Sequence, residues 1–337
     1  MKHVFIINPK AGKGKAAETM RPQLKEIGAR LGVDWEMHVT SRAYEAIEFI
    51  KERAAREPDE YFRFYACGGD GTVFEVANGV YGVPNAEFAV IPLGSGNDFI
   101  RLFGGKSVFL ELENVILGES VPIDVIDCGN GQIAVNQCSM GFDAEACAMQ
   151  IKYKRSPLFT GETAYIAAMF NRFLTRMGEV FEVSLDGVPY DDEGRRYLLC
   201  AVANSRWYGG GFMVAPRAMP DDGYLDCMII RMRENKFQML PVATQMRKGE
   251  HLGFPHSEYI RCKKVEILAH RDSAVNVDGE MSTVRKSCFE IREKALKFVL
   301  PVGHTYDTVR AQWEEDEKTN PVQFGVHESK IKVKKEA

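Results

Sequence analysis

Two glycine-rich turns, each placed between an apolar run and a helical pattern, constrain this fold more than any other feature. The first, Cys67-Gly68-Gly69-Asp70-Gly71-Thr72, ends the apolar run 63–67, and the second, Leu93-Gly94-Ser95-Gly96-Asn97-Asp98-Phe99, ends the run 88–92. Continuous apolar runs predict strands that helices cover on both faces, as in a parallel sheet. Ligands of such sheets bind beyond the carboxyl ends of the strands, which is where both turns fall.

The N-terminal third repeats this alternation of strand and helix. Residues 3–7 and 34–39 read as short strands, and residues 44–55 read as a helix. Residues 16–31 carry Met20, Leu24, Ile27 and Leu31 at a spacing that places them on one helical face. We therefore predict a doubly wound α/β domain that binds a nucleotide over residues 1–124.

The pattern changes beyond about residue 125. Residues 181–185 alternate apolar with polar side chains, and further strand-like pieces lie at 197–203, 225–232, 265–269, 275–277, 288–291 and 298–302. Strands with few helices between them predict a β-sandwich over residues 125–299, which we expect to bind the acceptor substrate. The spacing within 158–177 predicts one helix.

The C-terminus is rich in charge from Ala311 onward, and its last residues, 330–335, are mostly lysines. Residues 300–320 are a candidate to complete the first domain, and we expect 321–337 to be a solvated, poorly ordered tail. The lysines could instead touch an anionic membrane surface.

Composition excludes several classes of protein. With 27% charged residues and a formal net charge of −4, the chain does not resemble a nucleic-acid binder. The sequence has no apolar segment long enough for a transmembrane helix or a signal peptide. Its eight cysteines form no C-x-x-C pair, which argues against a zinc site or a disulfide framework. We expect a reduced, cytoplasmic protein.

The first turn predicts a phosphate site. Its glycines let the backbone approach an anion and direct free N–H groups toward it at the start of a helix. A carboxylate in the same turn would repel a phosphate, unless Asp70 handles a metal ion or accepts a proton. Asp70 is therefore a candidate catalytic residue.

Two familiar nucleotide folds are disfavoured. The second turn misses the dinucleotide fingerprint because Phe99 stands where a third glycine belongs. The loop Asn8-Pro9-Lys10-Ala11-Gly12-Lys13-Gly14-Lys15 misses the Walker A pattern because no Ser or Thr follows its lysine.

Together these three loops resemble the diacylglycerol kinase catalytic domain, a superfamily that includes bacterial diacylglycerol kinases, sphingosine kinases and ceramide kinases. The resemblance continues through Glu75-Val76, Asn78-Gly79, Val121-Pro122-Ile123-Asp124, Asn136, Gly141-Phe142-Asp143, Asp221-Asp222-Gly223-Tyr224-Leu225-Asp226 and Asp278-Gly279-Glu280. Only the residues beyond about 310 lie outside it.

The resemblance implies an NAD kinase-like fold and an ATP- and Mg²⁺-dependent lipid kinase, with diacylglycerol as the expected acceptor. The residues that it implies for ATP binding are Asn8, Pro9, Lys10, Gly12, Gly14, Thr40, Gly68, Gly69, Asp70, Gly71, Thr72, Glu75, Gly94, Ser95, Asn97 and Asp98. The candidate bases are Asp70, Asp278 and Glu280, with the last two expected across an interdomain cleft.

The resemblance also implies a largely structural magnesium site, formed by the backbone oxygens of Met219 and Tyr224 and the carboxylate of Asp222, with Asp124 as a neighbour behind it. Cationic help for phosphate could come from Lys13, Lys15 or the cluster Lys152, Lys154 and Arg155, although a solvated basic patch explains that cluster equally well.

Two alternatives remain open: a kinase of a small molecule, such as an NAD kinase, and a nucleotide sensor without turnover. We expect transient peripheral contact with a membrane, where the lipid lies. The sequence does not decide which lipid is used, which acid takes the proton, or whether the chain forms a homodimer.

Overall fold

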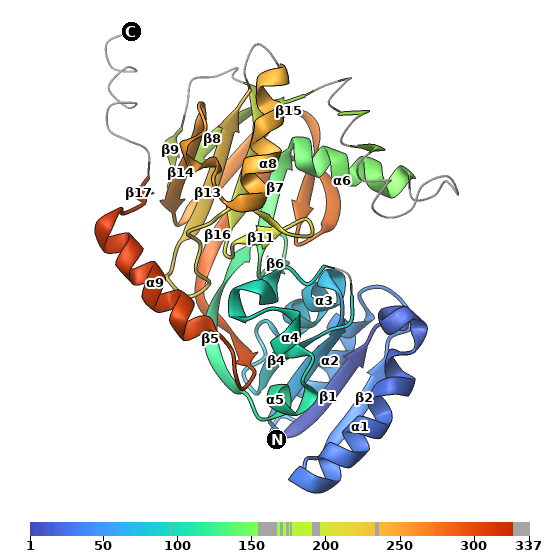
Figure 1. The fold of residues 1–337 in the computed structure, drawn as a ribbon. Coiled ribbons are helices and arrows are strands. Elements are labelled where there is room, and N and C mark those ends of the chain that lie inside the picture. The colour runs from blue at the N-terminus through green and yellow to red at the C-terminus, as the bar shows by residue number, and fades with distance from the viewer. Residues whose placement is uncertain are drawn as a thin grey trace. The chain divides into compact units, whose positions relative to one another are not determined.

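The computed structural model describes residues 1–94, 96–153, 167–168, 171–172, 175, 177–190, 196–232 and 236–325. The chain divides into two compact units (Figure 1). The first comprises Met1–Val125, Ile133–Val135 and Arg292–Glu314, and the second comprises Ile126–Gln132, Asn136–Ile291 and the chain from Glu315 onward.

A parallel sheet forms the centre of the first unit. Its strands are β1 (Lys2–Ile7), β2 (Trp35–Val39), β3 (Phe62–Gly68) and β4 (Ala86–Pro92), and they lie in the order β4-β3-β1-β2. The last part of β16 (Glu280–Leu300) pairs with β4 in parallel at Phe298 and Phe88. The four N-terminal strands are those that the apolar runs predict.

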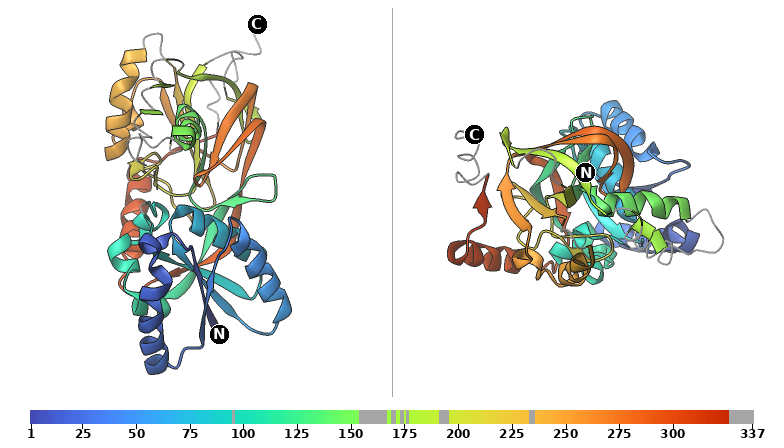
Figure 2. Two further views of the ribbon diagram at one scale, coloured as in Figure 1. Left: turned by 90° about the vertical axis from the view of Figure 1, so that its right-hand side faces the viewer. Right: turned by 90° about the horizontal axis from the view of Figure 1, so that it is seen from above.

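Helices cover both faces of this sheet. The longer ones are α1 (Ala16–Leu31), α2 (Glu45–Arg56) and α3 (Asp70–Val80), and the shorter ones are η1 (Ala11–Gly14), η2 (Phe99–Phe103), α4 (Lys106–Phe109) and α5 (Leu112–Ile116). Figure 2 shows α1 and α2 on opposite faces of the sheet. On the α1 side, Met20 and Leu24 pack over Phe5 and Tyr65 in one buried cluster. Burial of this apolar face explains why the 16–31 spacing forms a helix.

The second unit is rich in antiparallel strands. Its path is β17-β14-β13-β10-β7-β15, with β15 then paired to β16, and β8 pairs with both β10 and β15. The bounds are β7 (Gln137–Gly141), β8 (Glu179–Leu185), β9 (Val188–Pro189), β10 (Arg196–Ala203), β11 (Trp207–Tyr208), β12 (Phe212–Met213), β13 (Leu225–Arg231), β14 (Ser257–Cys262), β15 (Lys264–Val277) and β17 (Gln323–Phe324). Strand β6 (Ile133–Ala134) and most of β5 (Glu119–Asp127) belong to the first unit.

Several boundaries differ from the sequence expectations. The pieces 265–269 and 275–277 belong to the single strand β15, and 288–291 and most of 298–302 belong to β16. Strand β15 runs through the polar residues between its two pieces, where its pairing with β16 shifts register between Leu268 and Ser273. The second glycine turn opens a short 3₁₀ helix, η2, and not an α-helix.

Helices α6 (Phe142–Tyr153), α8 (Leu240–Lys248) and α9 (Tyr306–Thr319) accompany the sheets. Helix α9 extends through the charge-rich residues that begin at Ala311, and its Glu317 pairs with Arg217 and with the buried Arg261, as described below. The lysine-rich residues 330–335 lie outside the described residues, as does most of the predicted helix 158–177.

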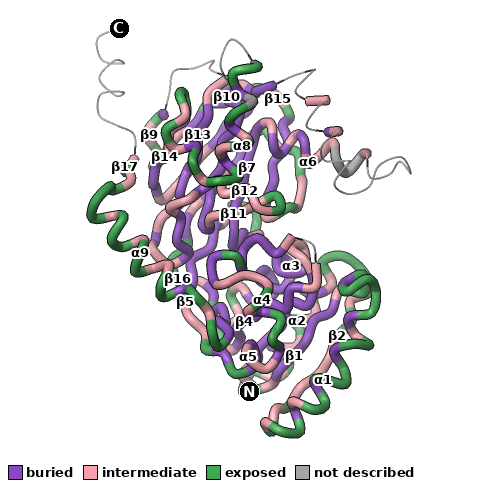
Figure 3. Tube along the Cα trace, in the orientation of Figure 1, coloured by how far each residue is buried: buried purple, intermediate pink, exposed green. Residues whose placement is uncertain are grey.

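Burial follows the strands in each unit (Figure 3). All eight cysteines are free thiols, five of them buried and three partly buried. Within the described parts of the chain, the longest apolar helical stretch falls short of what crossing a membrane requires.

Candidate active site

Four loops of the first unit meet at the carboxyl edge of its parallel sheet. Asn8, after β1, directs its amide Nδ2 toward the Thr72 hydroxyl at 3.4 Å. In the same loop, the Gly12 N–H donates to the Leu93 carbonyl at 3.3 Å, which connects it to the turn after β4. Thr40, after β2, donates its N–H to the Ile7 carbonyl at 3.0 Å. The structure thus gathers the loops that the sequence assigns to a nucleotide.

Glycine is required where two of these loops touch. A Cβ atom on Gly94 would lie 2.4 Å from the Cα of Gly69, and one on Gly68 would lie 2.2 Å from the Thr72 hydroxyl oxygen. A Cβ on Gly96 would lie 2.0 Å from a carboxylate oxygen of Asp70. Gly94 and Gly96 thus permit the close approach of the turns after β3 and β4, and Gly68 leaves room for Thr72 within its own turn.

The carboxylate of Asp70 joins the two turns. Its Oδ2 accepts the N–H of Asn97 at 2.9 Å, and its Oδ1 accepts the N–H of Asp98 at 3.0 Å. Charge-assisted bonds of this kind are stronger than neutral ones. Asp70 therefore has a positioning role that its place in a phosphate turn did not predict.

Asn97 occupies the left-handed region with φ 61°, which asparagine tolerates better than most residues. Its Nδ2 donates to the Gly68 carbonyl at 3.1 Å. The neighbouring Asp98 carboxylate accepts from Arg101 at 2.7 Å. Ser95, in the same turn, lies outside the described residues.

One cation at this edge was missed from the sequence. Lys106 Nζ donates to the Gly94 carbonyl at 2.7 Å and so reaches the second turn from α4. No motif marks it, because only the fold brings residue 106 to that turn. Of the lysines proposed from the sequence, Lys13 and Lys15 are exposed, while Lys154 and the side chain of Lys152 fall outside the described residues, together with Arg155.

Glu75 lies on α3, and its Oε2 accepts the Ala46 N–H near the start of α2 at 3.4 Å.

Lys10 and Pro9 are exposed in the loop after β1, where the Lys10 N–H donates to Asn8 Oδ1 at 2.9 Å. Gly14 follows in this loop with φ 82°, a value that favours glycine. Gly71 lies in the first turn of α3 beside Thr72.

In the second unit, Asp278 and Gly279 form the two-residue turn between β15 and β16. Both have positive φ, 48° and 96°, as a type I′ hairpin turn requires. Asp278 Oδ1 accepts the N–H groups of Asn136 at 3.1 Å and of Gln137 at 2.7 Å. These bonds fix the carboxylate, and Glu280 follows it as the first residue of β16, partly buried.

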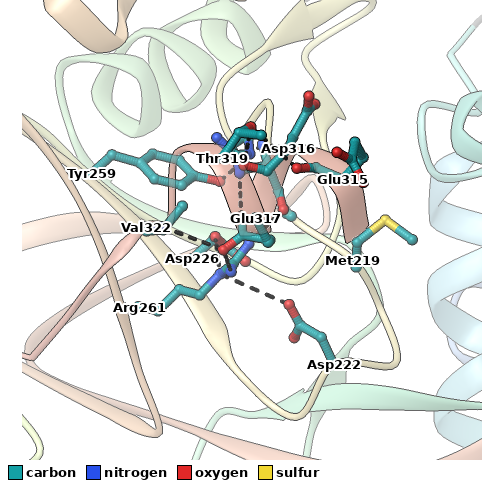
Figure 4. Close-up of polar contacts among 12 residues, drawn as sticks. Met219, Asp222, Asp226, Tyr259, Arg261, Glu315, Asp316, Glu317, Thr319 and Val322 are labelled. Atoms are coloured by element: carbon teal, nitrogen blue, oxygen red, sulfur yellow. Dashed lines mark hydrogen bonds and ion pairs between the residues drawn. The ribbon is translucent and has the colours of Figure 1, made fainter. Parts of the chain in front are cut away.

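The loop 219–224 is anchored by a buried arginine (Figure 4). Arg261, 2% exposed, lies 3.1 Å from Asp226 Oδ1 and 3.8 Å from Asp222 Oδ2. Its Nη1 is 2.8 Å from Glu317 Oε2 on α9, and Arg217 Nη2 is 2.5 Å from Glu317 Oε1. Burial raises the pKa of Asp226, which the charge of Arg261 opposes.

This loop is compatible with a magnesium ion. Among the described residues, no three side chains of His, Cys, Asp or Glu gather as metal ligands. A cation here would rely on the Asp222 carboxylate, the backbone oxygens of Met219 and Tyr224, and water, which is a set typical of Mg²⁺. The ion pairs at this loop join three carboxylates to two guanidinium groups, so the excess negative charge suits a cation.

Asp124 belongs to the first unit and is 1% exposed. Its Oδ1 accepts the N–H of Lys294, a residue with φ 53° in β16, at 2.7 Å. The observed contact of Asp124 therefore supports the irregular backbone of β16.

Comparison with known proteins agrees with this architecture. Residues 2–128 match the diacylglycerol kinase catalytic domain, and residues 136–300 match the YegS C-terminal NAD kinase beta sandwich-like domain. A crystal structure of a diacylglycerol kinase from Bacillus anthracis covers 89% of this chain and 97% of its own, with a TM-score of 0.62 at 20% identity. The predicted fold class, an α/β domain followed by a β-sandwich domain, is confirmed.

Similar sequences show the family to which the chain belongs. The chain is 30% identical to the diacylglycerol kinase of Bacillus subtilis over 300 residues, which are 88% of this chain and 95% of that protein. It is also 30% identical to the diacylglycerol kinase of Staphylococcus carnosus over 283 residues, 82% of this chain and 87% of that one. On these matches, which span most of both chains, the protein belongs to the diacylglycerol kinase family.

Proposed function

We propose that this kinase transfers the γ-phosphoryl group of ATP to the hydroxyl group of a lipid, with diacylglycerol as the acceptor and phosphatidic acid as the product. The observation that carries the proposal is the junction of the turns after β3 and β4, where Asp70 binds two N–H groups of the second turn. Family membership supplies the lipid class, through relatives named as diacylglycerol kinases.

The nucleotide would lie on the carboxyl edge of the parallel sheet. Strand–turn–helix junctions present N–H groups and a helix N-terminus to phosphate oxygens, and the start of α3 offers both. Phosphoryl transfer depends mainly on positioning and on neutralising charge. The bonds of Asp70 and Lys106 to the second turn would hold the phosphate groups in register.

The acceptor hydroxyl needs a proton acceptor. In the proposed step, the hydroxyl oxygen forms a bond to the γ-phosphorus, the bond to the ADP oxygen breaks, and the proton passes to a carboxylate. Asp278 and Glu280 are the candidates in the second unit, and a positioned carboxylate contributes roughly 10²-fold to 10⁴-fold. The two N–H bonds to Asp278 would hold its carboxylate in a fixed orientation.

Magnesium, when bound, would neutralise phosphate charge at the nucleotide and stabilise the loop 219–224 at Asp222. Arg261 would orient this loop whether or not the ion is present, because its contacts to Asp226 and Glu317 belong to the protein itself.

The decisive experiment is an assay with labelled ATP and Mg²⁺ against a panel of acceptors: diacylglycerol, sphingosine, ceramide, phosphatidylglycerol and NAD. We expect labelled phosphatidic acid from diacylglycerol. Labelled NADP in place of any lipid product would refute the proposal and favour a small-molecule kinase. Binding of ATP without transfer to any acceptor would instead favour a nucleotide sensor.

A further inference from the structure

One face of the sheet in the second unit changes from polar to apolar along its strands. Neighbouring strands place Gln137, Ala203, Asp226 and Arg261 opposite one another in one row. Side chains two residues apart on a strand share a face, so the next row on the same face contains Ser139, Ala201 and Met228.

The rows beyond are apolar. Ala201, Ala203, Met228 and Ile230 belong to one buried cluster, which also contains Met239 and residues of α8. The alanine side chains are short and extend little from the sheet, and the methionine side chains can adapt their shape to flexible partners. The face therefore has a polar end at the Gln137 and Ser139 rows, and its apolar rows pack against Val214 and α8.

At the polar end, Gln137 has a buried side-chain amide without a partner. The residue is 2% exposed, and neither its Nε2 nor its Oε1 has a hydrogen-bond partner among the described residues. Burying an unpaired amide opposes folding, because both its donor and its acceptor lose their bonds to water. A chain that retains such a group in its core often does so for function.

The same residue contacts the candidate base directly. The Gln137 N–H donates to Asp278 Oδ1 at 2.7 Å, and the Asp278 N–H donates to the Gln137 carbonyl at 2.9 Å. Gln137 therefore joins the polar end of this sheet face to the carboxylate proposed to take the proton.

The neighbouring acid, Asp143, has a partner for one oxygen, while its buried Oδ1 has none among the described residues. Asp143 Oδ2 accepts the Ser139 hydroxyl at 2.6 Å, and burial raises the pKa of Asp143. A neutral amide that offers one donor and one acceptor suits a head group with a hydroxyl and an ester carbonyl. A cationic amine would call for an ionised carboxylate in the same place.

We propose that the side-chain amide of Gln137 binds the uncharged glycerol end of the acceptor lipid and so selects neutral diacylglycerols over amine-bearing lipids. The inference rests on the proposed lipid kinase function and adds the residue that reads the head group.

The test is the variant Gln137→Leu, which keeps the approximate volume and removes the amide. We expect KM for dioleoylglycerol in mixed micelles to rise about 10-fold to 100-fold, with kcat within about threefold, because the lost bonds form on binding. The melting temperature should stay the same or rise, because an unpaired buried amide is removed. The control is Ser273→Ala, which removes a buried hydroxyl group from β15 and should leave KM unchanged.

A KM within twofold of the wild type in a folded Gln137→Leu protein would overturn the inference, and would indicate that the amide binds water and not the lipid. If that variant fails to fold, Gln137→Met replaces it, with the thermal shift caused by dioctanoylglycerol as the readout. An undiminished shift would again overturn the inference. A wild-type protein that phosphorylates no lipid would defeat the proposed function itself, an outcome recognisable before any variant is made.

Discussion

At the scale of single residues, Asp70 has a structural role beside the catalytic role that we propose for it. Its carboxylate accepts two N–H groups of the turn after β4, so it shapes the loop that would cover the phosphates. A carboxylate is suited to this because both oxygens accept. Asp70 is also the first residue of α3, in the turn where the sequence predicts phosphate binding and catalysis.

We predict that Asp70→Asn abolishes measurable kinase activity, a loss of at least about 100-fold, while the protein stays folded. Asparagine has one acceptor oxygen, so one of the two N–H groups would face an NH₂ group and the second turn would loosen. Activity would be measured with labelled ATP, and folding by circular dichroism. Asp59→Asn, at an exposed position, is the matched control. Full activity of Asp70→Asn would remove this residue from the mechanism.

At the scale of secondary-structure elements, the C-terminal segment holds the loop 219–224. Glu317 contacts two arginines, and its Oε2 also accepts the Val322 N–H at 3.3 Å. Strand β17 pairs with β14 beside Arg261, and the Phe324 ring packs edge-on against Tyr224 at 4.8 Å. Residues distant in sequence therefore fix the loop on which the proposed magnesium site depends.

We predict that Glu317→Gln lowers the free energy of unfolding by about 2–5 kcal/mol, because it leaves the buried Arg261 with one carboxylate fewer. Glu315→Gln removes the same charge from an exposed pair with Lys318 on the same helix and should change stability by less than about 0.5 kcal/mol. Urea unfolding of both variants would measure these free energies and test the prediction. Equal effects of the two substitutions would show that α9 does not anchor the loop.

At the scale of the whole molecule, nucleotide binding and stability are linked. A ligand at 100 times its Kd stabilises the folded state by about 2.7 kcal/mol, which in a chain of this size raises Tm by roughly 3–5 °C. We predict a shift of this order with ATP and Mg²⁺ in differential scanning fluorimetry and none with NAD at the same concentration. A shift with NAD as large as that with ATP would contradict the lipid kinase proposal.

The sequence was sufficient for the α/β order and for the loops that meet at the sheet edge. Apolar runs that end at glycine turns leave few alternatives, because parallel strands must deliver their loops to one edge. Residues 16–31 and 62–68 follow their patterns closely for this reason.

The ordered C-terminus could not be predicted from local pattern. Most of residues 311–319 are polar or charged, yet they form part of α9, in which Glu317 pairs with Arg217 and Arg261, more than 50 residues away in sequence. Charge composition alone predicts solvation, and only the fold supplies the buried partners.

What the sequence alone determined is the family, the fold class and the set of loops, since these depend on local periodicity and on glycines at fixed positions. The tertiary structure decided the partners of individual polar groups: Asp70 with the turn after β4, Lys106 with Gly94, Asp278 with the N–H of Gln137, and Glu317 with Arg261. The physical reason is that hydrogen bonds and ion pairs act over a few ångströms, so they depend on which distant residues the fold brings together.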